Sequence, residues 1–232
     1  MKRNVLLLSV LALPMFYASA SATMPGNFAD ATRYDVTIRK IELCESSACN
    51  SPYVAASLSG KIFDIASVGA GSSVGSLVDL KSIPLYRIWS HVRVTLAPYF
   101  AITATGTDDA ANTCWTNSAN TASSHTALGV STTGGGGPAT AQTLYVPNVN
   151  AFGASVPSSS DYSSYGVSKT DNSDVVVTYA LTAPYVCKGV MPTITVKFDT
   201  KNSIKFYDSS GGGGATCTSY PAPPTVTITA SD

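Results

Sequence analysis

Five cysteines carry the clearest chemistry in the sequence. In an oxidising compartment thiols pair as disulfides. Cys44 and Cys49 lie close together in CESSACN, so we predict that they close a small loop at the end of a strand. Cys114 and Cys217 both lie in loops rich in Gly, Ser and Thr, and they form the second predicted pair. Cys187 is left over, either as a buried thiol or as half of a bridge between subunits.

Motifs for catalysis are absent from the sequence, which has no G-x-S-x-G elbow, no H-E-x-x-H pair and no P-loop. Only His91 and His125 can act as imidazole bases. His91 shares a strand face with Trp89 and Arg93, and His125 lies in the polar stretch SSHT. We therefore predict that the chain is not an enzyme, and we keep a secreted hydrolase as the third of three hypotheses.

Oxygen ligands gather in two polar stretches of the chain. Asp108 and Asp109 lie in GTDDAAN, and Asp171, Asn172 and Asp174 lie in TDNSD. Calcium prefers such oxygens, but neither stretch has the spacing of an EF-hand. Asp and Asn also favour turns through bonds to their own backbone. We predict no cofactor, with a calcium ion as the alternative.

Aromatic side chains can stack on the apolar faces of sugars. The candidates for such a platform are Trp89, Trp115, Tyr162 and Tyr165, and Trp115 lies next to Cys114. In the alternative interpretation, Trp89 covers a strand face and the tyrosines decorate turns. A glycan is therefore a candidate ligand.

The N-terminus has the three parts of a secretory signal. Lys2 and Arg3 are basic, residues 5–17 are apolar, and residues 18–22 (ASASA) offer small residues for cleavage. The apolar run is shorter than the roughly 20 residues of a spanning helix. We predict a signal peptide at 1–22 and a secreted protein, extracellular or at the cell surface, without a membrane span after its removal.

The charge balance excludes a polyanionic partner. Charged residues make up 12% of the chain, against about 25% in ordinary soluble proteins. Loss of Lys2 and Arg3 with the signal lowers the 14 basic residues to 12 against 14 acidic ones, a net charge of −2. Such a chain has no electrostatic footprint for nucleic acid.

The stretch 86–105 supplies the strongest strand signal. Apolar and polar residues alternate from 87 to 96, which puts one row on a buried strand face. Pro98 interrupts the run, so we predict a central hairpin or a bent strand over 86–105. The predicted core residues of this strand are Ile88, Val92, Val94 and Leu96, and the opposite, exposed row is Arg87, Trp89, His91, Arg93 and Thr95.

Other short apolar runs, separated by Gly, Pro and Ser, indicate further strands. A change of phase at Arg39-Lys40 predicts a β-bulge. We interpret residues 23–33 as a mobile segment before the first strand, and we interpret residues 106–142 and 153–173 as polar loop insertions. We predict one domain over 23–232, an all-β antiparallel sandwich of Ig-like or jelly-roll type, with a barrel as the alternative. Further strands are expected at 34–43, 54–58, 61–68, 143–152, 174–183, 192–199 and 203–207, with a short strand or helical turn at 74–80.

The C-terminus is the feature that points to a function. A stiff spacer, Pro221-Ala222-Pro223-Pro224, precedes an alternating terminal segment. Such a segment can be donated to the open edge of a neighbouring copy, with the N-terminal segment 23–38 as the competing donor; in the alternative, it is an ordinary last strand of its own sheet. The predicted donor residues are Thr225, Val226, Thr227, Ile228, Thr229 and Ala230.

These features predict a secreted structural subunit of a bacterial extracellular filament or surface assembly, a homopolymer built by strand donation. The alternative is a monomeric carbohydrate-binding or adhesive module.

Overall fold

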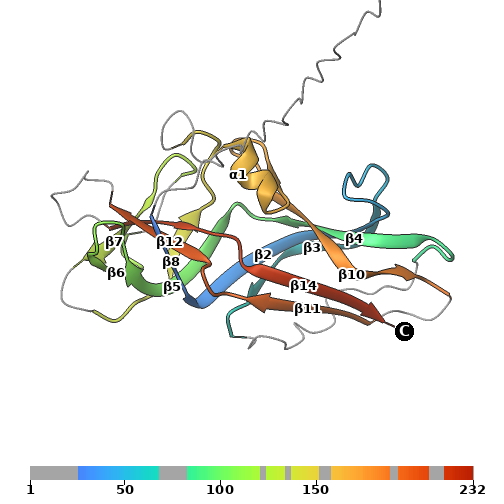
Figure 1. The fold of residues 1–232 in the computed structure, drawn as a ribbon, viewed down its shortest axis with the longest axis horizontal. Coiled ribbons are helices and arrows are strands. Elements are labelled where there is room, and N and C mark those ends of the chain that lie inside the picture. The colour runs from blue at the N-terminus through green and yellow to red at the C-terminus, as the bar shows by residue number, and fades with distance from the viewer. Residues whose placement is uncertain are drawn as a thin grey trace, which may run out of the picture.

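The computed structural model describes residues 26–67, 83–120, 124–133, 137–151, 158–188, 193–208 and 217–231. Within them the chain is all-β with one short helix, as predicted (Figure 1). The predicted signal peptide (1–22) and the predicted element at 74–80 lie outside these residues. The elements are β1 (Asn27–Ala29), β2 (Ala31–Cys44), β3 (Tyr53–Asp64), β4 (Ile88–Leu96), β5 (Tyr99–Thr107), β6 (Thr113–Trp115), β7 (Gly129–Thr133), β8 (Gln142–Tyr145), α1 (Ser159–Ser164), β9 (Val167–Lys169), β10 (Val175–Val186), β11 (Thr193–Asp199), β12 (Ile204–Asp208), β13 (Cys217–Pro221) and β14 (Thr225–Ser231).

Strand β2 is the centre of the fold. Its first half pairs with β5 and its second half with β4, while β3 lies along its other edge. β4 and β5 therefore form one bent strand against β2, which is the second of the two predicted arrangements. At the bend, the Ala97 amide donates to the Thr37 carbonyl at 2.9 Å. Pro98, which has no N–H, follows at the break between the two strands.

The predicted bulge in β2 is confirmed. The pairing of β2 with both β3 and β4 shifts between Ile38 and Lys40. The extra residue, Arg39, points outward, and its guanidinium lies 2.9 Å from the Asp174 carboxylate. The bulge keeps the apolar residues before and after it on one buried face: Tyr34, Val36, Ile38, Ile41 and Leu43.

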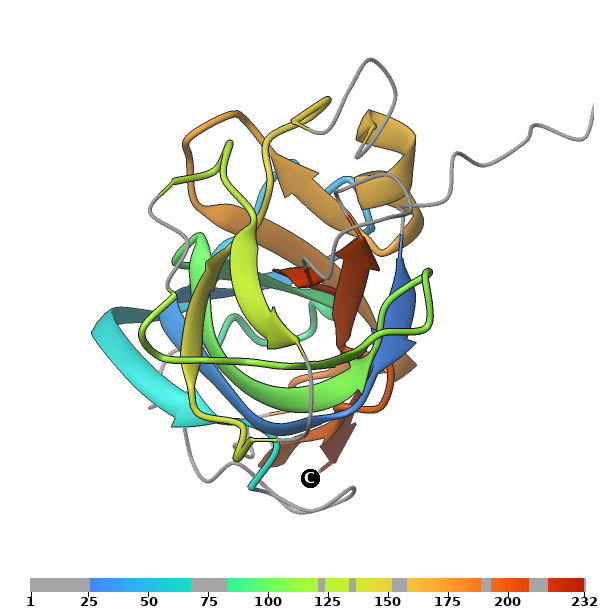
Figure 2. The ribbon, with the colours of Figure 1, turned by 90° about the vertical axis from the view of Figure 1, so that its left-hand side faces the viewer.

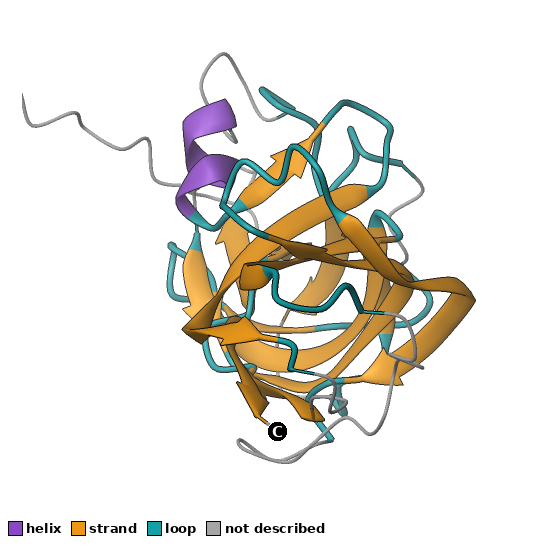
Figure 3. Cartoon of the chain, turned by 90° about the vertical axis from the view of Figure 1, so that its right-hand side faces the viewer, coloured by secondary structure: helices purple, strands orange, loops and turns teal. Residues whose placement is uncertain are grey.

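The strands form two sheets that are joined into one hydrogen-bonded path, and one sheet is a strongly curled, mixed half-barrel (Figures 2 and 3). From β4 the path runs through β10 and β14 to β11, and from β5 through β6, β7, β13 and β12 to β1. The prediction of a purely antiparallel fold is wrong at one joint, because β10 and β14 are parallel.

The core of the curled sheet corrects one predicted residue of β4. Ile88 is 56% exposed, whereas Trp89, expected on the outer face, is fully buried. Val92 is buried, and Val94 and Leu96 are half-buried against the core, as predicted. The cause lies in the partner strand: β10 carries extra residues between its pairings with His91 and Trp89, and this irregularity reverses the phase of β4.

Several polar stretches form regular structure that the apolar pattern did not predict. The segment 23–33 contains β1 and the start of β2, the tract 106–142 contains β6 and β7, and the tract 153–173 contains α1 and β9. The run at 54–58 and the first half of the run at 61–68 belong to one strand, β3, which ends at Asp64 and is followed by a turn at 65–67. Gly60, at a φ of 76°, lets that strand continue through a conformation that other residues rarely adopt.

Candidate functional site

The C-terminal strand β14 fits the alternation expected of it. It pairs with β11 along all seven of its residues, Thr225 opposite Asp199 through Ser231 opposite Thr193. Ile228 is buried at the centre, and Val226 and Ala230 are half-buried on the same face. Thr225, Thr227 and Thr229 are exposed. The strand therefore presents one apolar row to the core and one row of hydroxyls to solvent.

β14 has far fewer register pairs with β10 than with β11, although it also packs against β10. Toward β10 the only register pair is Leu181 with Ile228, in a parallel arrangement. Both side chains are buried, so the joint relies on apolar packing more than on backbone hydrogen bonds. In Figure 1, β11 and β14 lie side by side below the strands of the central sheet.

A fixed point and a short stiff spacer precede β14. The Ala222 amide donates to the Ser203 carbonyl at 2.9 Å, and the Tyr34 hydroxyl donates to the Ala222 carbonyl at 3.2 Å. Burial raises the pKa of Tyr34 well above its ordinary value of 10.0, so this hydroxyl keeps its proton. Pro223 and Pro224 follow, and because proline fixes φ they favour an extended chain.

The N-terminal segment is held more firmly than the C-terminal one. Residues of β2 up to Ile38 pair with β5 and β4 on one edge and with β3 on the other. Removing 23–38 would therefore open the centre of the sheet. Of the two candidate donors, β14 is the one whose departure leaves the central ladders in place.

Four of the cysteines pair as predicted. One disulfide joins Cys44 to Cys49 at the turn between β2 and β3, and the other joins Cys114 in β6 to Cys217 in β13. Cys187 is buried and belongs to neither of these two disulfides. Disulfides form and persist in oxidising compartments, which agrees with the prediction of export.

A buried carboxylate lies beside the second disulfide. Asp108 is fully buried, and its oxygens come close to the sulfurs of Cys114 and Cys217. Those sulfurs are bonded to each other and are not thiolate ligands. The Asp108 carboxylate instead accepts from the amides of Ala110 at 3.0 Å and Asn112 at 2.8 Å. Asp108, a predicted calcium ligand, therefore stabilises the turn that follows it.

The second predicted oxygen cluster also holds loops together. The Asp171 carboxylate accepts from the Val149 amide at 3.1 Å, and Asn172 exchanges two hydrogen bonds with Asn148. Asp174 is paired with Arg39, as described above. Each of these side chains is committed to a protein partner that ties one segment to another.

The predicted aromatic platform is not assembled. Trp89, Trp115 and Tyr162 are buried, and Tyr165 is exposed. Tyr162 donates its hydroxyl to the Pro147 carbonyl, and its pKa is raised above the ordinary value by burial and, to a smaller degree, by Asp171. These rings serve the core and the loop packing, and they do not share one exposed surface.

The two histidines have structural neighbours. The Nδ1 atom of His91 lies 2.8 Å from the hydroxyl of the adjacent Ser90, and that of His125 lies 3.1 Å from the Val146 carbonyl. The His125 ring also meets the edge of Tyr145 at 5.0 Å. Within the part of the chain that the structure describes, neither histidine is hydrogen-bonded to a carboxylate, as the histidine of a catalytic triad would be.

No helix among the described residues is long and apolar enough to cross a membrane. Comparison with known proteins finds no match for this chain among protein-family models, curated proteins or solved structures. The function must therefore be inferred from the residues and their geometry.

Proposed function

We propose that the chain is a secreted structural subunit of a bacterial extracellular filament or surface assembly, and that it polymerises by donating β14 to a neighbouring copy. The observation that carries this proposal is the unequal attachment of β14. Its ladder to β11 is complete, whereas one parallel pair, Leu181 with Ile228, ties it to β10. An Ig-like or jelly-roll form of the sandwich belongs to the same proposal.

Exchange between identical copies changes few contacts. The β14 of one copy takes the place that the neighbour's own β14 leaves, so Ile228 meets an identical Leu181 and an identical ladder from β11. The balance between monomer and polymer then depends on concentration and on the hinge. Pro223 and Pro224 favour the extended hinge that an outgoing strand needs, and the Ala222 contacts keep the rest of the chain in place.

The composition supports the same function. A chain with 12% charged residues has little charge repulsion between copies. Two disulfides stabilise the subunit in an oxidising environment. A monomeric carbohydrate-binding module is the second candidate, and it is favoured by a tyrosine pair on a different face, the exposed Tyr99 with the half-buried Tyr145.

The experiment that tests this proposal places a pair of cysteines across the ladder between β11 and β14. Thr195 and Thr229 are directly opposite each other in β11 and β14. Opposed antiparallel residues have Cα atoms about 4.5–5.5 Å apart, within the range that a disulfide spans. In the double variant Thr195→Cys/Thr229→Cys, an undonated β14 closes the bridge within one chain, and a donated β14 closes it between chains.

We expect oxidised, concentrated protein to give a ladder of covalent multimers on a non-reducing denaturing gel. The single variants Thr195→Cys and Thr229→Cys control for random coupling and should give at most dimers. If concentrated protein yields only internally bridged monomers, and negative-stain microscopy finds no assemblies, strand donation is wrong.

A further inference from the structure

The outer face of β2, β5 and β8 gathers a second set of side chains with a common chemistry. Tyr34, Phe100, Ile102 and Leu144 point inward and are buried. Because side chains alternate along a strand, their neighbours share the outer face. In register, this face carries Arg33 opposite Thr103, Asp35 opposite Ala101, Ala101 opposite Thr143, and Tyr99 opposite Tyr145.

Aromatic rings form one side of this face. The rings of Tyr99 and Tyr145 lie 5.6 Å apart and are tilted by 54°. The His125 ring meets Tyr145 at 5.0 Å, so three rings follow one another across the end of the face. Tyr99 is 38% exposed, and its ring is accessible to a ligand. The small residues Ala101 and Thr143 form the floor next to the tyrosines.

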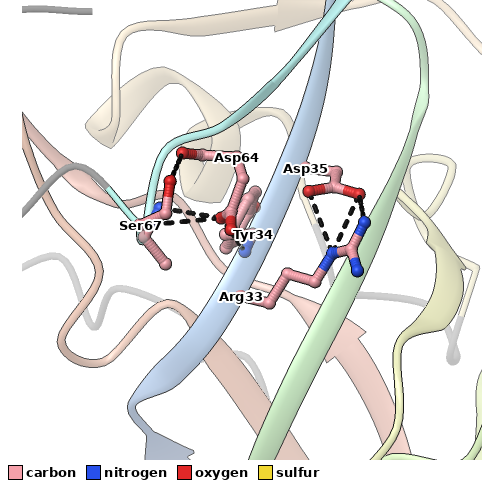
Figure 4. A network of polar contacts seen from close by, with 6 residues as sticks. Arg33, Tyr34, Asp35, Asp64 and Ser67 are labelled. Atoms are coloured by element: carbon pink, nitrogen blue, oxygen red, sulfur yellow. Dashed lines mark hydrogen bonds and ion pairs between the residues drawn. The ribbon is translucent and has the colours of Figure 1, made fainter.

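A charged pair forms the other side. The Arg33 guanidinium donates to both oxygens of Asp35, with Nη2 at 2.7 Å and Nε at 3.1 Å from Oδ2 and Nε at 3.2 Å from Oδ1. Figure 4 shows the two side chains facing each other between β2 and β5. Arg33 has five N–H donors and a carboxylate has about four lone-pair sites, so the pair retains capacity for further hydrogen bonds. Asp64, by contrast, accepts from the Tyr34 amide at 3.0 Å and caps a turn with Ser67 (Figure 4).

We propose that this face binds a neutral chain of β-linked pyranose sugars. The C–H faces of such sugars stack on aromatic rings, and their equatorial hydroxyls both donate and accept hydrogen bonds. Diagonal neighbours across paired strands are about 7–8 Å apart, which places Tyr99 roughly one sugar residue from Asp35, while Tyr145 lies one strand further, on β8. An open sheet face with a small-residue floor suits an extended chain better than a single terminal sugar.

The experiment is isothermal titration calorimetry of the full chain, as monomer, with cellohexaose, chitohexaose and laminarihexaose. We expect at least one of them to bind, and Tyr99→Ala and Asp35→Asn each to weaken that binding by about tenfold, the cost of losing one stacking ring or one polar anchor. Tyr99→Phe keeps the ring and should bind like the wild type. Tyr165→Ala removes an exposed tyrosine elsewhere and is the matched control.

Ala101→Glu serves as a second variant, because it blocks the floor without removing a packed side chain and should abolish binding. The proposal is overturned if none of the three sugars binds at millimolar concentration. It is equally overturned if Tyr165→Ala weakens binding as much as Tyr99→Ala does. β14 contributes no residue to this face, so either result is independent of strand donation.

Discussion

Removing the two disulfides one at a time should cost very different amounts of stability. The bond between Cys114 and Cys217 closes a loop with a sequence separation of 103, and the bond between Cys44 and Cys49 one with a separation of 5. A crosslink stabilises the native state mainly by restricting the unfolded chain, and the restriction grows with loop length. The double variant Cys114→Ala/Cys217→Ala should therefore suffer far more than Cys44→Ala/Cys49→Ala.

The magnitude follows from the loop lengths. The chain-entropy relation gives about 4.7 kcal/mol for the long loop and about 2 kcal/mol for the short one at 25 °C. All four cysteines are buried, so the loss of packed sulfur is similar in the two variants and largely cancels in the comparison. The expected difference in the free energy of unfolding is thus about 2–3 kcal/mol.

The assay is equilibrium unfolding in urea, followed by tyrosine and tryptophan fluorescence. The slope m should rise more for the long-loop variant, because its unfolded state expands further and exposes more surface. Equal losses of stability in the two variants, or a larger loss for Cys44→Ala/Cys49→Ala, would refute the loop-entropy reasoning. The β6–β13 crosslink would then act through local packing alone.

Three further predictions concern β4 and its neighbours. Val92→Ala should destabilise the fold by about 1–3 kcal/mol in urea titrations, through lost burial and the cavity left behind; a neutral effect would show that the inward face of β4 is misassigned. Arg93→Ala should also destabilise, because Arg93 Nε lies 2.8 Å from the buried Glu42 carboxylate, and adding Glu42→Gln should recover part of the loss; no recovery would mean that Arg93 acts through packing. Burial raises the pKa of Glu42, but hydrogen bonds from Arg93 and Lys40 outweigh it, so the net pKa lies below the ordinary 4.5. Because the pKa of Glu42 is lower in the folded state than in the unfolded state, its ion pairs stabilise the fold above the unfolded-state pKa, and this stability is lost as the pH falls through the folded-state pKa. Glu42→Gln should therefore flatten the loss of stability on the acid side in thermal melts between neutral and acidic pH. An unchanged pH profile would contradict the ion-paired role of Glu42.

Alternation predicted the strands that bury one face and expose the other. In β14 and in the part of β2 from Tyr34 to Ile38 the apolar row and the polar row separate, because there the strand has the core on one side only. Even the bulge at Arg39 was visible, since a change of phase within one strand is a local signal. These strands needed no knowledge of their partners.

The strands that escaped prediction are held by contacts distant in sequence. Every residue of β13 is buried, yet its sequence, CTSYP, has no alternation. Its Ser219 hydroxyl accepts from Ser131 at 2.8 Å within a buried polar cluster that includes Gln142. The disulfide from Cys217 to Cys114 fixes β13 near β6. A pattern of hydrophobic residues cannot reveal strands whose interior is polar.

The exchange of Ile88 and Trp89 has the same kind of cause. The alternation of β4 is regular in its own sequence, and only the irregular pairing with β10 shifts it. The features of the candidate site likewise divide into those that follow from local sequence and those that depend on residues far away in the chain. The alternation of β14 could be predicted, whereas the fixed point at Ala222 depends on Tyr34, far away in sequence.

The two proposed surfaces lie on different strands, and this separation has a consequence for function. β2 and β4 lie between β5 and β10 along the sheet, so an assembly built through β14 leaves the outer face of β5 and β8 uncovered at that joint. Each added subunit would present another copy of the Tyr99–Tyr145 face. Linked copies bind a repeating polysaccharide with an effective concentration that a free monomer lacks, and overall avidity can exceed single-site affinity by about 10²–10⁴. A weak sugar contact on an open sheet face is therefore compatible with firm attachment of a filament.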